Sequence, residues 1–256
     1  MGWFSKKGLD LVKSLVEKHQ CPLPIVVLTG SGISAESGIQ TFRGQDGLWN
    51  GTKIEEVCRP ESFEMNPGVV VDFYNQRIKD MLDTKVQPNA SHFALAKLEQ
   101  ELVEVYILTQ NVDDLHERAG SEKIYHIHGT LFRVKCHTCK KTFPLKDKIE
   151  FPNQCLKCHK INSLRPDVVF FKETPYFMRE AENLVNNAGI FLSIGTSGVV
   201  YPAAGFVRSS RRNGALCIEI NPNPTDNGDL FAAQIEKKAG EILPEMVDEL
   251  VSIIKK

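Results

Sequence analysis

The chain has 256 residues, of which 42% are hydrophobic and 25% charged, a balance that is typical of globular proteins and excludes a disordered chain. Its 31 basic and 32 acidic side chains leave a formal net charge of −1, which argues against binding to nucleic acid or to an anionic membrane. No apolar run reaches the ~20 residues that a membrane-spanning helix needs. We therefore expect a soluble cytoplasmic protein with neither kind of partner, and a monomer is compatible with this sequence.

Short apolar runs alternate with helical patterns along the chain. A Lys-rich amphipathic pattern at 4–19 comes first, and residues 24–29 then form a β-branched apolar run. Further apolar runs lie at 103–108, 190–194 and 215–220, and helical patterns at 92–102 and 174–187. This alternation predicts an α/β fold, a Rossmann-like parallel sheet covered on both faces.

A glycine-rich loop follows the first apolar run. Gly30, Gly32 and Ala35 match the G-x-G-x-x-A spacing with which backbone N–H groups approach a pyrophosphate at the start of a helix. A tight strand-to-helix turn would use the same residues. The acidic residue expected about twenty positions later is missing, and 41–44 read Thr-Phe-Arg-Gly, so ordinary dehydrogenase-type binding is not expected.

Polar residues follow each of the other apolar runs, at 109–111, 195–198 and 221–223. Because the carboxyl ends of parallel strands meet at one edge of a sheet, we expect these residues to converge on one crevice.

Two segments interrupt the alternation, a helix-like stretch at 44–82 and a cysteine-containing stretch at 130–164. We expect them to form a smaller zinc-binding domain, and 1–43, 83–129 and 165–256 to form the large domain.

The second insertion carries two Cys-x-x-Cys pairs separated by fifteen residues, a spacing that suits one tetrahedral zinc ion. Four thiolates complete the shell and leave no open position, so this zinc would be structural. Two redox dithiols or reduced surface thiols are the alternatives, but neither explains the pairing. The four predicted ligands are Cys136, Cys139, Cys155 and Cys158. The other cysteines, Cys21, Cys58 and Cys217, are interpreted as buried small hydrophobic residues.

Taken together, these segments resemble the sirtuins, a family of NAD-dependent protein deacylases. The resembling stretches run in family order from about residue 24 to the end of the chain. Besides the cysteine pairs they are GSGISAESGIQTFRG at 30–44, TQNVD at 109–113, LHERAG at 115–120, HIHG at 126–129, RPDVVFF at 165–171, GTS at 195–197 and AGEILP at 239–244.

The resemblance implies transfer of an acyl group from a lysine side chain to ADP-ribose, with release of nicotinamide. It assigns His128 as the general base and Asn111 to the nicotinamide ribose and its water. A neutral imidazole near pH 7 suits that task. The alternatives are that His126 and His128, expected on one strand face, are packed polar residues or a metal pair, and that Asn111 caps a helix running to Arg118.

The resemblance also implies contacts to NAD. Phe42 would cover the reacting ribose, Arg43 would face a phosphate, and Val112 and Asp113 would hold the nicotinamide amide. The complete predicted set is Gly30, Ser31, Gly32, Ile33, Glu36, Thr41, Phe42, Arg43, Trp49, Gln110, Asn111, Val112, Asp113, Gly195, Thr196, Ser197, Asn221 and Ala239.

The segment 73–77 resembles the class III branch of the family, whose members remove acidic acyl groups such as succinyl and malonyl. Tyr74 and Arg77 lie three residues apart on a helical pattern, so they share one face and would both reach the acyl pocket. A solvated helix face is the alternative. A guanidinium matches a carboxylate in bidentate fashion, which would favour acidic acyl chains. The peptide would run beside Val169 and Phe171 on one side and 198–200 on the other.

The sequence departs from the family at four positions. Ser31 replaces an alanine, Gln40 a proline and Lys172 a glycine, while Cys58 stands where related chains carry alanine in the acyl pocket. Lys172 raises the question of backbone geometry at the peptide cleft, and Cys58 would narrow the pocket. Competing hypotheses are an ADP-ribosyltransferase or NAD hydrolase, a non-enzymatic NAD sensor that binds acyl-lysine, and a zinc-ribbon nucleic-acid binder.

Overall fold

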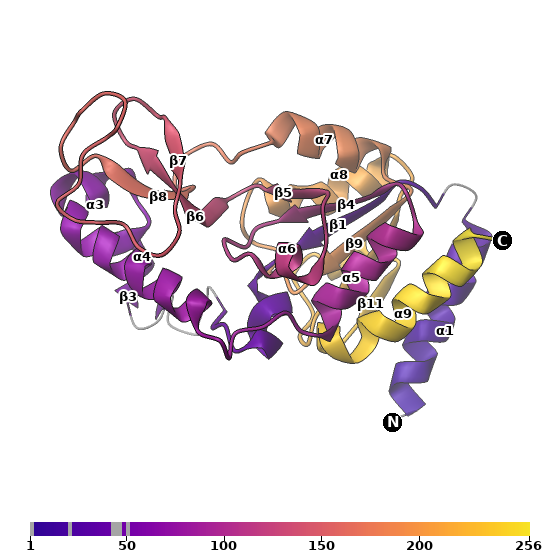
Figure 1. The fold of residues 1–256 in the computed structure, drawn as a ribbon. Helices are drawn as coiled ribbons and strands as arrows, with labels where there is room; N and C mark the ends of the chain where they lie inside the picture. The colour runs from indigo at the N-terminus through magenta and orange to yellow at the C-terminus, as the bar shows by residue number, and fades with distance from the viewer. Residues whose placement is uncertain (1–2, 20–21, 42–47, 50–51) are drawn as a thin grey trace.

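The computed structural model describes residues 3–19, 22–41, 48–49 and 52–256. Within them the chain forms a large domain around a parallel sheet and a smaller domain to one side of it, and both termini lie on the large domain (Figure 1). None of the helices in these ranges has the length and apolar character of a membrane span.

Six strands of the described residues build the sheet of the large domain. They are β1 (Ile25–Thr29), β4 (Val105–Thr109), β5 (Ile124–His126), β9 (Ile190–Ile194), β10 (Leu216–Ile220) and β11 (Ala233–Ile235). All pairs are parallel, in the spatial order β11-β10-β9-β1-β4-β5. Every residue of β1, β9 and β10 is buried, as expected for strands covered on both faces. The strand order reverses between β1 and β9, the place where sheets of this kind bind ligands.

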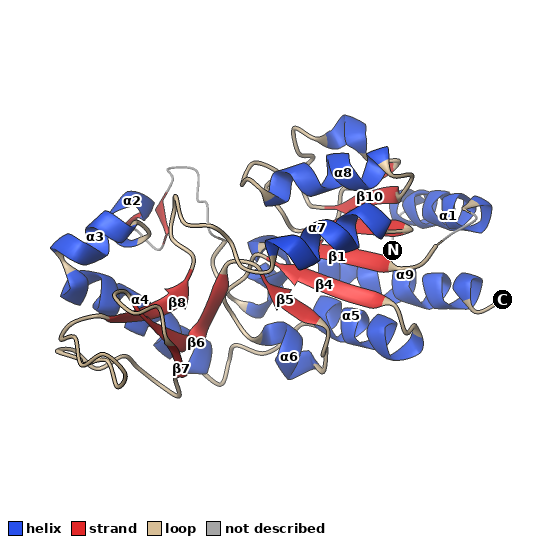
Figure 2. Cartoon of the chain, turned by 90° about the horizontal axis from the view of Figure 1, so that it is seen from above, coloured by secondary structure: helices blue, strands red, loops and turns tan. Residues whose placement is uncertain are grey.

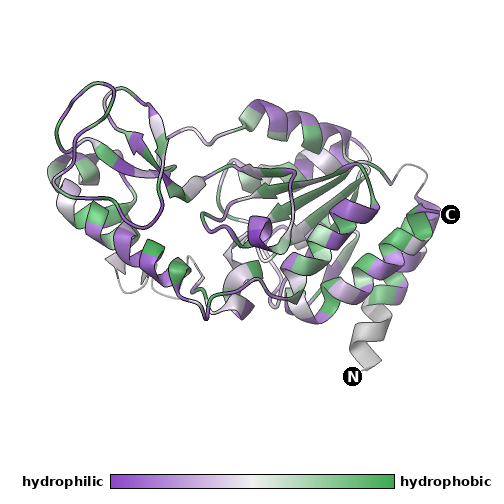
Figure 3. Cartoon of the chain, in the orientation of Figure 1, coloured by the Kyte–Doolittle hydropathy of each residue, from purple (hydrophilic) through white to green (hydrophobic). Residues whose placement is uncertain are grey.

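Helices cover both faces of this sheet (Figure 2). One face carries α1 (Trp3–Lys18), α5 (Ala90–Glu101) and α9 (Ala239–Ile254), and the other carries α7 (Met178–Asn187) and α8 (Phe206–Arg212). The shorter elements of this domain are η1 (Ser31–Ser37), α6 (Leu115–Ala119), η2 (Ala203–Gly205) and η3 (Gly228–Leu230). Apolar residues concentrate in the strands and in the helix faces turned toward them (Figure 3). They form two hydrophobic cores, one on each face of the sheet.

The small domain combines a helical layer with an antiparallel sheet. Its elements are β2 (Leu48–Trp49), β3 (Thr52–Lys53), α2 (Ile54–Val57), α3 (Pro60–Met65), α4 (Pro67–Leu82), β6 (Gly129–Cys136), β7 (Thr142–Pro144) and β8 (Leu164–Val168). The sheet has the order β7-β6-β8, and α4 packs on it around a separate core that contains Val71, Ile78 and Leu131. The predicted α/β class, with a smaller domain built from two insertions, is confirmed.

Two boundaries differ from the predictions. The segment 165–168 was assigned to the large domain, but β8 pairs with β6, and both Val168 and Phe170 pack in the small-domain core. The helix predicted from Thr174 begins only at Met178, because Phe177 before it has a left-handed backbone conformation with φ 56°.

Candidate active site

Two glycine-containing loops touch where the strand order reverses. The Gly32 N–H donates to the carbonyl oxygen of Gly195 at 2.9 Å, and the Gly30 N–H to that of Ile194 at 3.0 Å. A Cβ on either Gly30 or Gly32 would lie 2.7 Å from an atom of Gly195, whose own φ is +60°. No side chain fits between these loops, so the glycines bring both backbones to the ligand-binding edge.

Other predicted cofactor residues gather at the same edge. The Asn221 side chain donates to the carbonyl oxygen of Thr196 at 2.8 Å, which joins the turns after β9 and β10. The Glu36 carboxylate accepts from the Gly240 N–H at 2.8 Å, at the start of α9 and next to Ala239. The side chain of Ile33 packs instead in the core of the large domain, its N–H donates to the carbonyl oxygen of Gly30 and its own carbonyl oxygen accepts from Asn89.

The loop after β4 is held by side chains from three segments. The Asn111 side chain donates to Ser34 Oγ at 3.1 Å, and Ser34 Oγ donates to Asp113 Oδ2 at 3.0 Å. The Asn111 N–H donates to Thr109 Oγ1 at 3.1 Å. The capping hypothesis is wrong in detail, because Asp114 occupies the N-cap of α6 while Asn111 turns toward Ser34. Sequence reasoning missed Ser34, although it lies inside the glycine-rich motif.

Asp113 is a buried residue of this same loop. Burial raises its pKa to about 6, against the opposing effect of hydrogen bonds from the Leu115 N–H and from Ser34. A buried carboxyl group beside a cavity is a natural partner for an amide ligand.

His128 lies in the turn after β5, not at the end of a strand, because β5 stops at His126. Burial lowers the pKa of His128, and a hydrogen bond with the backbone of Gln110 offsets part of that shift. The imidazole is therefore neutral at pH 7, as a general base must be. The next residue, Gly129, has φ +81°, and a Cβ there would lie 1.9 Å from the carbonyl oxygen of Asp167.

His126 and His128 turn to different partners, which argues against a metal pair. His126 Nδ1 is 3.1 Å from the carbonyl oxygen of Asn111, and its Nε2 is 2.6 Å from Glu117 Oε1. Burial lowers the pKa of His126, but the contacts with Glu117 and Asn111 raise it by more. His126 thus supports the loop that carries Asn111.

A cavity of about 280 Å³ lies between the two domains' segments. Its lining joins residues 38–40 of the glycine-rich motif to Arg77 and Asp80 on α4 and to Val112 and Asp113 after β4. Val112 and Asp113, predicted to bind the cofactor, therefore line the same cavity as Arg77, predicted to bind the acyl group.

Arg77 is mostly buried, with 12% of its side chain exposed. Its Nε lies 3.3 Å from Asp80 Oδ2, and its guanidinium lies over the Phe73 ring at 4.6 Å from the centroid. A solvated helix face is therefore not its environment. The sequence analysis missed Asp80, the acidic partner at this cavity.

Tyr74 lies deeper than Arg77 and is fully buried. Its hydroxyl is 3.3 Å from Cys58 Sγ, and its ring stacks on Phe170 with centroids 6.0 Å apart. Burial is the largest cause that raises the pKa of Tyr74 well above its ordinary value, so the phenol stays protonated. Cys58 and Cys217 are both buried, as predicted.

The predicted peptide-binding segment joins these groups. The Val169 N–H donates to the carbonyl oxygen of His128, and the Phe171 N–H donates to that of Cys58. Lys172 has φ +73°, the left-handed conformation that glycine adopts readily, and its Nζ pairs with Glu61 Oε1 at 3.0 Å. Lys172 therefore retains a glycine-like backbone despite the departure noted in the sequence.

The four predicted cysteines lie together at the outer end of the small domain. Their sulfur atoms are all within 4.8 Å of one another. The Sγ–Sγ distances of 3.6 Å for Cys136 and Cys158 and 3.7 Å for Cys139 and Cys155 fit the ~3.8 Å edge expected for Zn–S bonds of 2.3 Å. Backbone N–H groups also donate to Cys136 Sγ and Cys155 Sγ, which suits thiolate ligands. The predicted ligand cluster is confirmed.

Some predicted site residues cannot be placed. Phe42, Arg43 and Cys21 lie outside the described residues, and only the backbone of Trp49 is described, in β2. Ser31 is the first residue of η1, and Thr41 lies after η1 and is exposed.

Comparisons with known proteins identify relatives of this chain. The model of the Sir2 family matches residues 30–202. An NAD-dependent protein deacylase of Vibrio cholerae is 47% identical over 229 residues, which cover 89% of this chain and 93% of that protein. A solved Sir2 homologue in complex with NAD has a TM-score of 0.85 and 38% identity, covering 95% of this chain and 94% of the other. A Sir2 structure with a p53 peptide and NAD+ has a TM-score of 0.79 and 31% identity, covering 95% and 97%.

Proposed function

The chain belongs to the Sir2 family, and from this premise we propose that it is an NAD-dependent protein deacylase that transfers acyl groups from lysine side chains to ADP-ribose, releases nicotinamide, and prefers succinyl and malonyl groups. The observation that carries the proposal is the single cavity that Arg77, Val112 and Asp113 line together. This arrangement supports an acidic acyl group beside a nicotinamide.

NAD would bind along the edge formed by the loops after β1 and β9 and would supply the ADP-ribose that accepts the acyl group. The glycines at 30, 32 and 195 place no side chain where these two loops meet, so the backbone at this edge stays accessible to a dinucleotide. Asp113, buried and bonded to Ser34, is suited to hold an amide, while the side chain of Asn111 bonds to the same Ser34 hydroxyl.

His128 is the group suited to take a proton. Its lowered pKa keeps the ring neutral, so the imidazole accepts a hydroxyl proton near pH 7 without first losing one. The bond from the Val169 N–H to the His128 carbonyl oxygen fixes the turn beside the predicted peptide segment. The base is thereby tied to the strand that would carry the acyl-lysine.

Selectivity for acidic acyl groups follows from the charge at Arg77. A carboxylate in this mostly buried place gains a charge-assisted hydrogen bond, which a neutral acetyl group cannot form. The carboxylate of Asp80, which already pairs with Arg77, repels a second carboxylate and so limits the free energy that an acidic acyl group gains there. The thiol of Cys58 lies against the Tyr74 hydroxyl, so an acyl chain that reached Tyr74 would also meet Cys58, which disfavours the longest acyl chains.

Zinc would be held by the four cysteines, far along β6 from His128, with a closed shell that supplies structure and no chemistry. None of the proton or acyl movements above involves it.

Mass spectrometry of matched peptides tests the function. One peptide carries succinyl-lysine and the other acetyl-lysine, each incubated with and without NAD. Preferred NAD-dependent desuccinylation, with nicotinamide and O-succinyl-ADP-ribose as products, is the expected result. Deacetylation alone would reject the acidic preference, and NAD consumption with both peptides unchanged would favour ADP-ribosyl transfer or NAD hydrolysis instead.

A further inference from the structure

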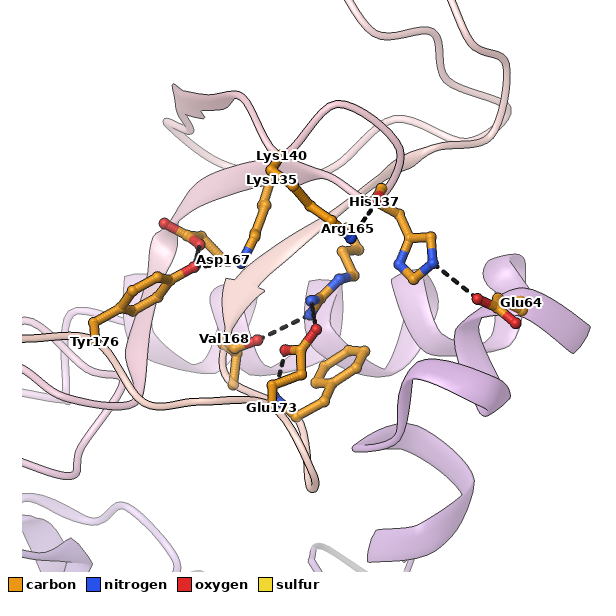
Figure 4. Close-up of polar contacts among 10 residues, drawn as sticks. Glu64, Lys135, His137, Lys140, Arg165, Asp167, Val168, Glu173 and Tyr176 are labelled. Carbon is orange, nitrogen blue, oxygen red and sulfur yellow. Dashed lines mark hydrogen bonds and ion pairs between the residues drawn. The ribbon is translucent and has the colours of Figure 1, made fainter. Parts of the chain in front are cut away.

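A partly buried ion pair lies at the loop that follows β8 (Figure 4). Arg165 on β8 is fully buried, and its Nη2 is 2.5 Å from Glu173 Oε1. Burial raises the pKa of Glu173, but the Phe170 N–H and Arg165 lower it by more, so the carboxyl group is ionised. At neutral pH both partners are charged, with Arg165 fully buried and 22% of the Glu173 side chain exposed.

Both partners also hold the backbone between them. Arg165 Nη1 donates to the carbonyl oxygen of Val168 at 2.9 Å, and Glu173 Oε2 accepts from the Phe170 N–H at 2.9 Å. The guanidinium also lies over the Phe170 ring, 4.1 Å from its centroid. One ion pair therefore closes the loop 168–173, which contains the left-handed Lys172.

The loop 168–173 contacts both the candidate base and the residues of the proposed acyl pocket. On one side, the Val169 N–H bonds to the carbonyl oxygen of His128. On the other side, the Phe170 ring stacks on Tyr74, and the Phe171 N–H bonds to the carbonyl oxygen of Cys58. A shift of the loop would move the candidate base and the acyl pocket together.

Stability alone is a weak reason for this arrangement. Burying two charges costs nearly as much as their attraction returns, and apolar residues of equal volume often stabilise a protein as well or better. An apolar pair, however, could not form hydrogen bonds with both a carbonyl oxygen and an N–H of the same loop.

We propose that Arg165 and Glu173 are positioning residues for the deacylation reaction, and that their ion pair sets the course of the loop 168–173 so that His128 and Tyr74 are correctly placed around the acyl-lysine. The inference rests on the proposed function and extends it to residues that touch neither NAD nor the acyl group.

Glu173→Gln is the sharpest test, because it keeps the size of the side chain but replaces one of two acceptor oxygens with an NH2 group. The amide cannot accept from both Arg165 and the Phe170 N–H, so the loop is released on one side. We expect kcat to fall about tenfold on both peptides, with a further loss in kcat/KM for the succinyl peptide, while KM for NAD changes less than twofold. Arg165→Met should give the same pattern and add nothing to Glu173→Gln in the double variant, because the pair acts as a unit.

The matched control is Glu61→Gln, which removes the other, exposed ion pair of the same loop, the one with Lys172. Its kcat should stay within twofold of the wild type. Melting temperature and zinc content are measured for every variant, since a purely structural role would lower the melting temperature and leave kcat per folded molecule unchanged.

The outcomes separate the two proposals. A wild type without NAD-dependent deacylation overturns both. An active wild type with Glu173→Gln at unchanged kcat and unchanged succinyl-to-acetyl ratio overturns only the positioning role, and if Arg165→Met does not fold, Glu173→Gln alone decides.

Discussion

Replacement of Arg77 by Met removes the one positive charge that lines the cavity within the described residues, while keeping an unbranched side chain of similar reach. Two opposite charges 4 Å apart attract by about 4 kcal/mol at an effective dielectric constant of 20. Asp80, 3.3 Å from the Arg77 Nε, already takes part of that attraction. Hydrogen bonds to charged groups contribute about 1.5–3 kcal/mol net, so we expect a loss of about 2–3 kcal/mol for a bound carboxylate.

In rate terms this loss lowers kcat/KM for the succinyl peptide by about 30- to 150-fold, since each 1.4 kcal/mol corresponds to a factor of ten. An acetyl group has no charge to lose, so its kcat/KM should fall less than about threefold. The assay is steady-state kinetics by mass spectrometry on two peptides that differ only in the acyl group.

Lys79→Met provides the matched control for Arg77→Met. Lys79 lies on the same helix, is exposed, and loses the same charge. Both peptides should be processed as by the wild type. Equal losses on succinyl and acetyl peptides in Arg77→Met would refute the charge argument and leave Arg77 as a structural residue of α4.

His128→Ala should abolish turnover on both peptides while circular dichroism and zinc content stay as in the wild type, and near-normal deacylation would contradict the assigned base. Burial lowers the pKa of His92 from 6.5 to about 4. Between these two pH values the unfolded chain binds a proton that the folded chain excludes, so the free energy of unfolding decreases as the pH falls through this range. This shift corresponds to about 3 kcal/mol, and urea unfolding at pH 7 and 4.5 should show a smaller acid loss in His92→Gln than in the wild type. Cys155→Ser should lose bound zinc and lower the melting temperature, and a variant that retains one zinc per chain would disprove the ligand set. Lys172→Val should be less stable than Lys172→Gly by about 1 kcal/mol or more, because a β-branched side chain is disfavoured at φ +73°; equal melting temperatures would count against strain at this position.

Sequence spacing predicted those parts of the site in which the chemistry is local. The zinc cluster follows from two pairs of closely spaced cysteines, because such knuckles bring their own sulfur atoms together. The sheet follows from buried, mainly apolar runs such as 190–194, which match β9 residue for residue. The predicted contacts of individual residues with NAD and with the acyl group remain predictions.

Contacts between distant segments escaped the sequence analysis. Ser34 is one residue of a recognised motif, yet its hydroxyl joins Asn111 to Asp113, some eighty positions away. Asp80 is a further case, because nothing in a helical pattern specifies that this carboxylate, 41% exposed, pairs with Arg77 at the cavity.

By itself, then, the sequence determined the main strands of the large sheet and the grouping of the four cysteines, because these depend on residue type and short spacing. Only the tertiary structure decided how these groups are oriented. Asn111 bonds to Ser34 rather than capping a helix, and Arg165 pairs with Glu173. Buried polar groups form hydrogen bonds with whichever neighbours the packing places beside them. Those neighbours come from elements far apart in the chain, and no local pattern specifies which of them will meet.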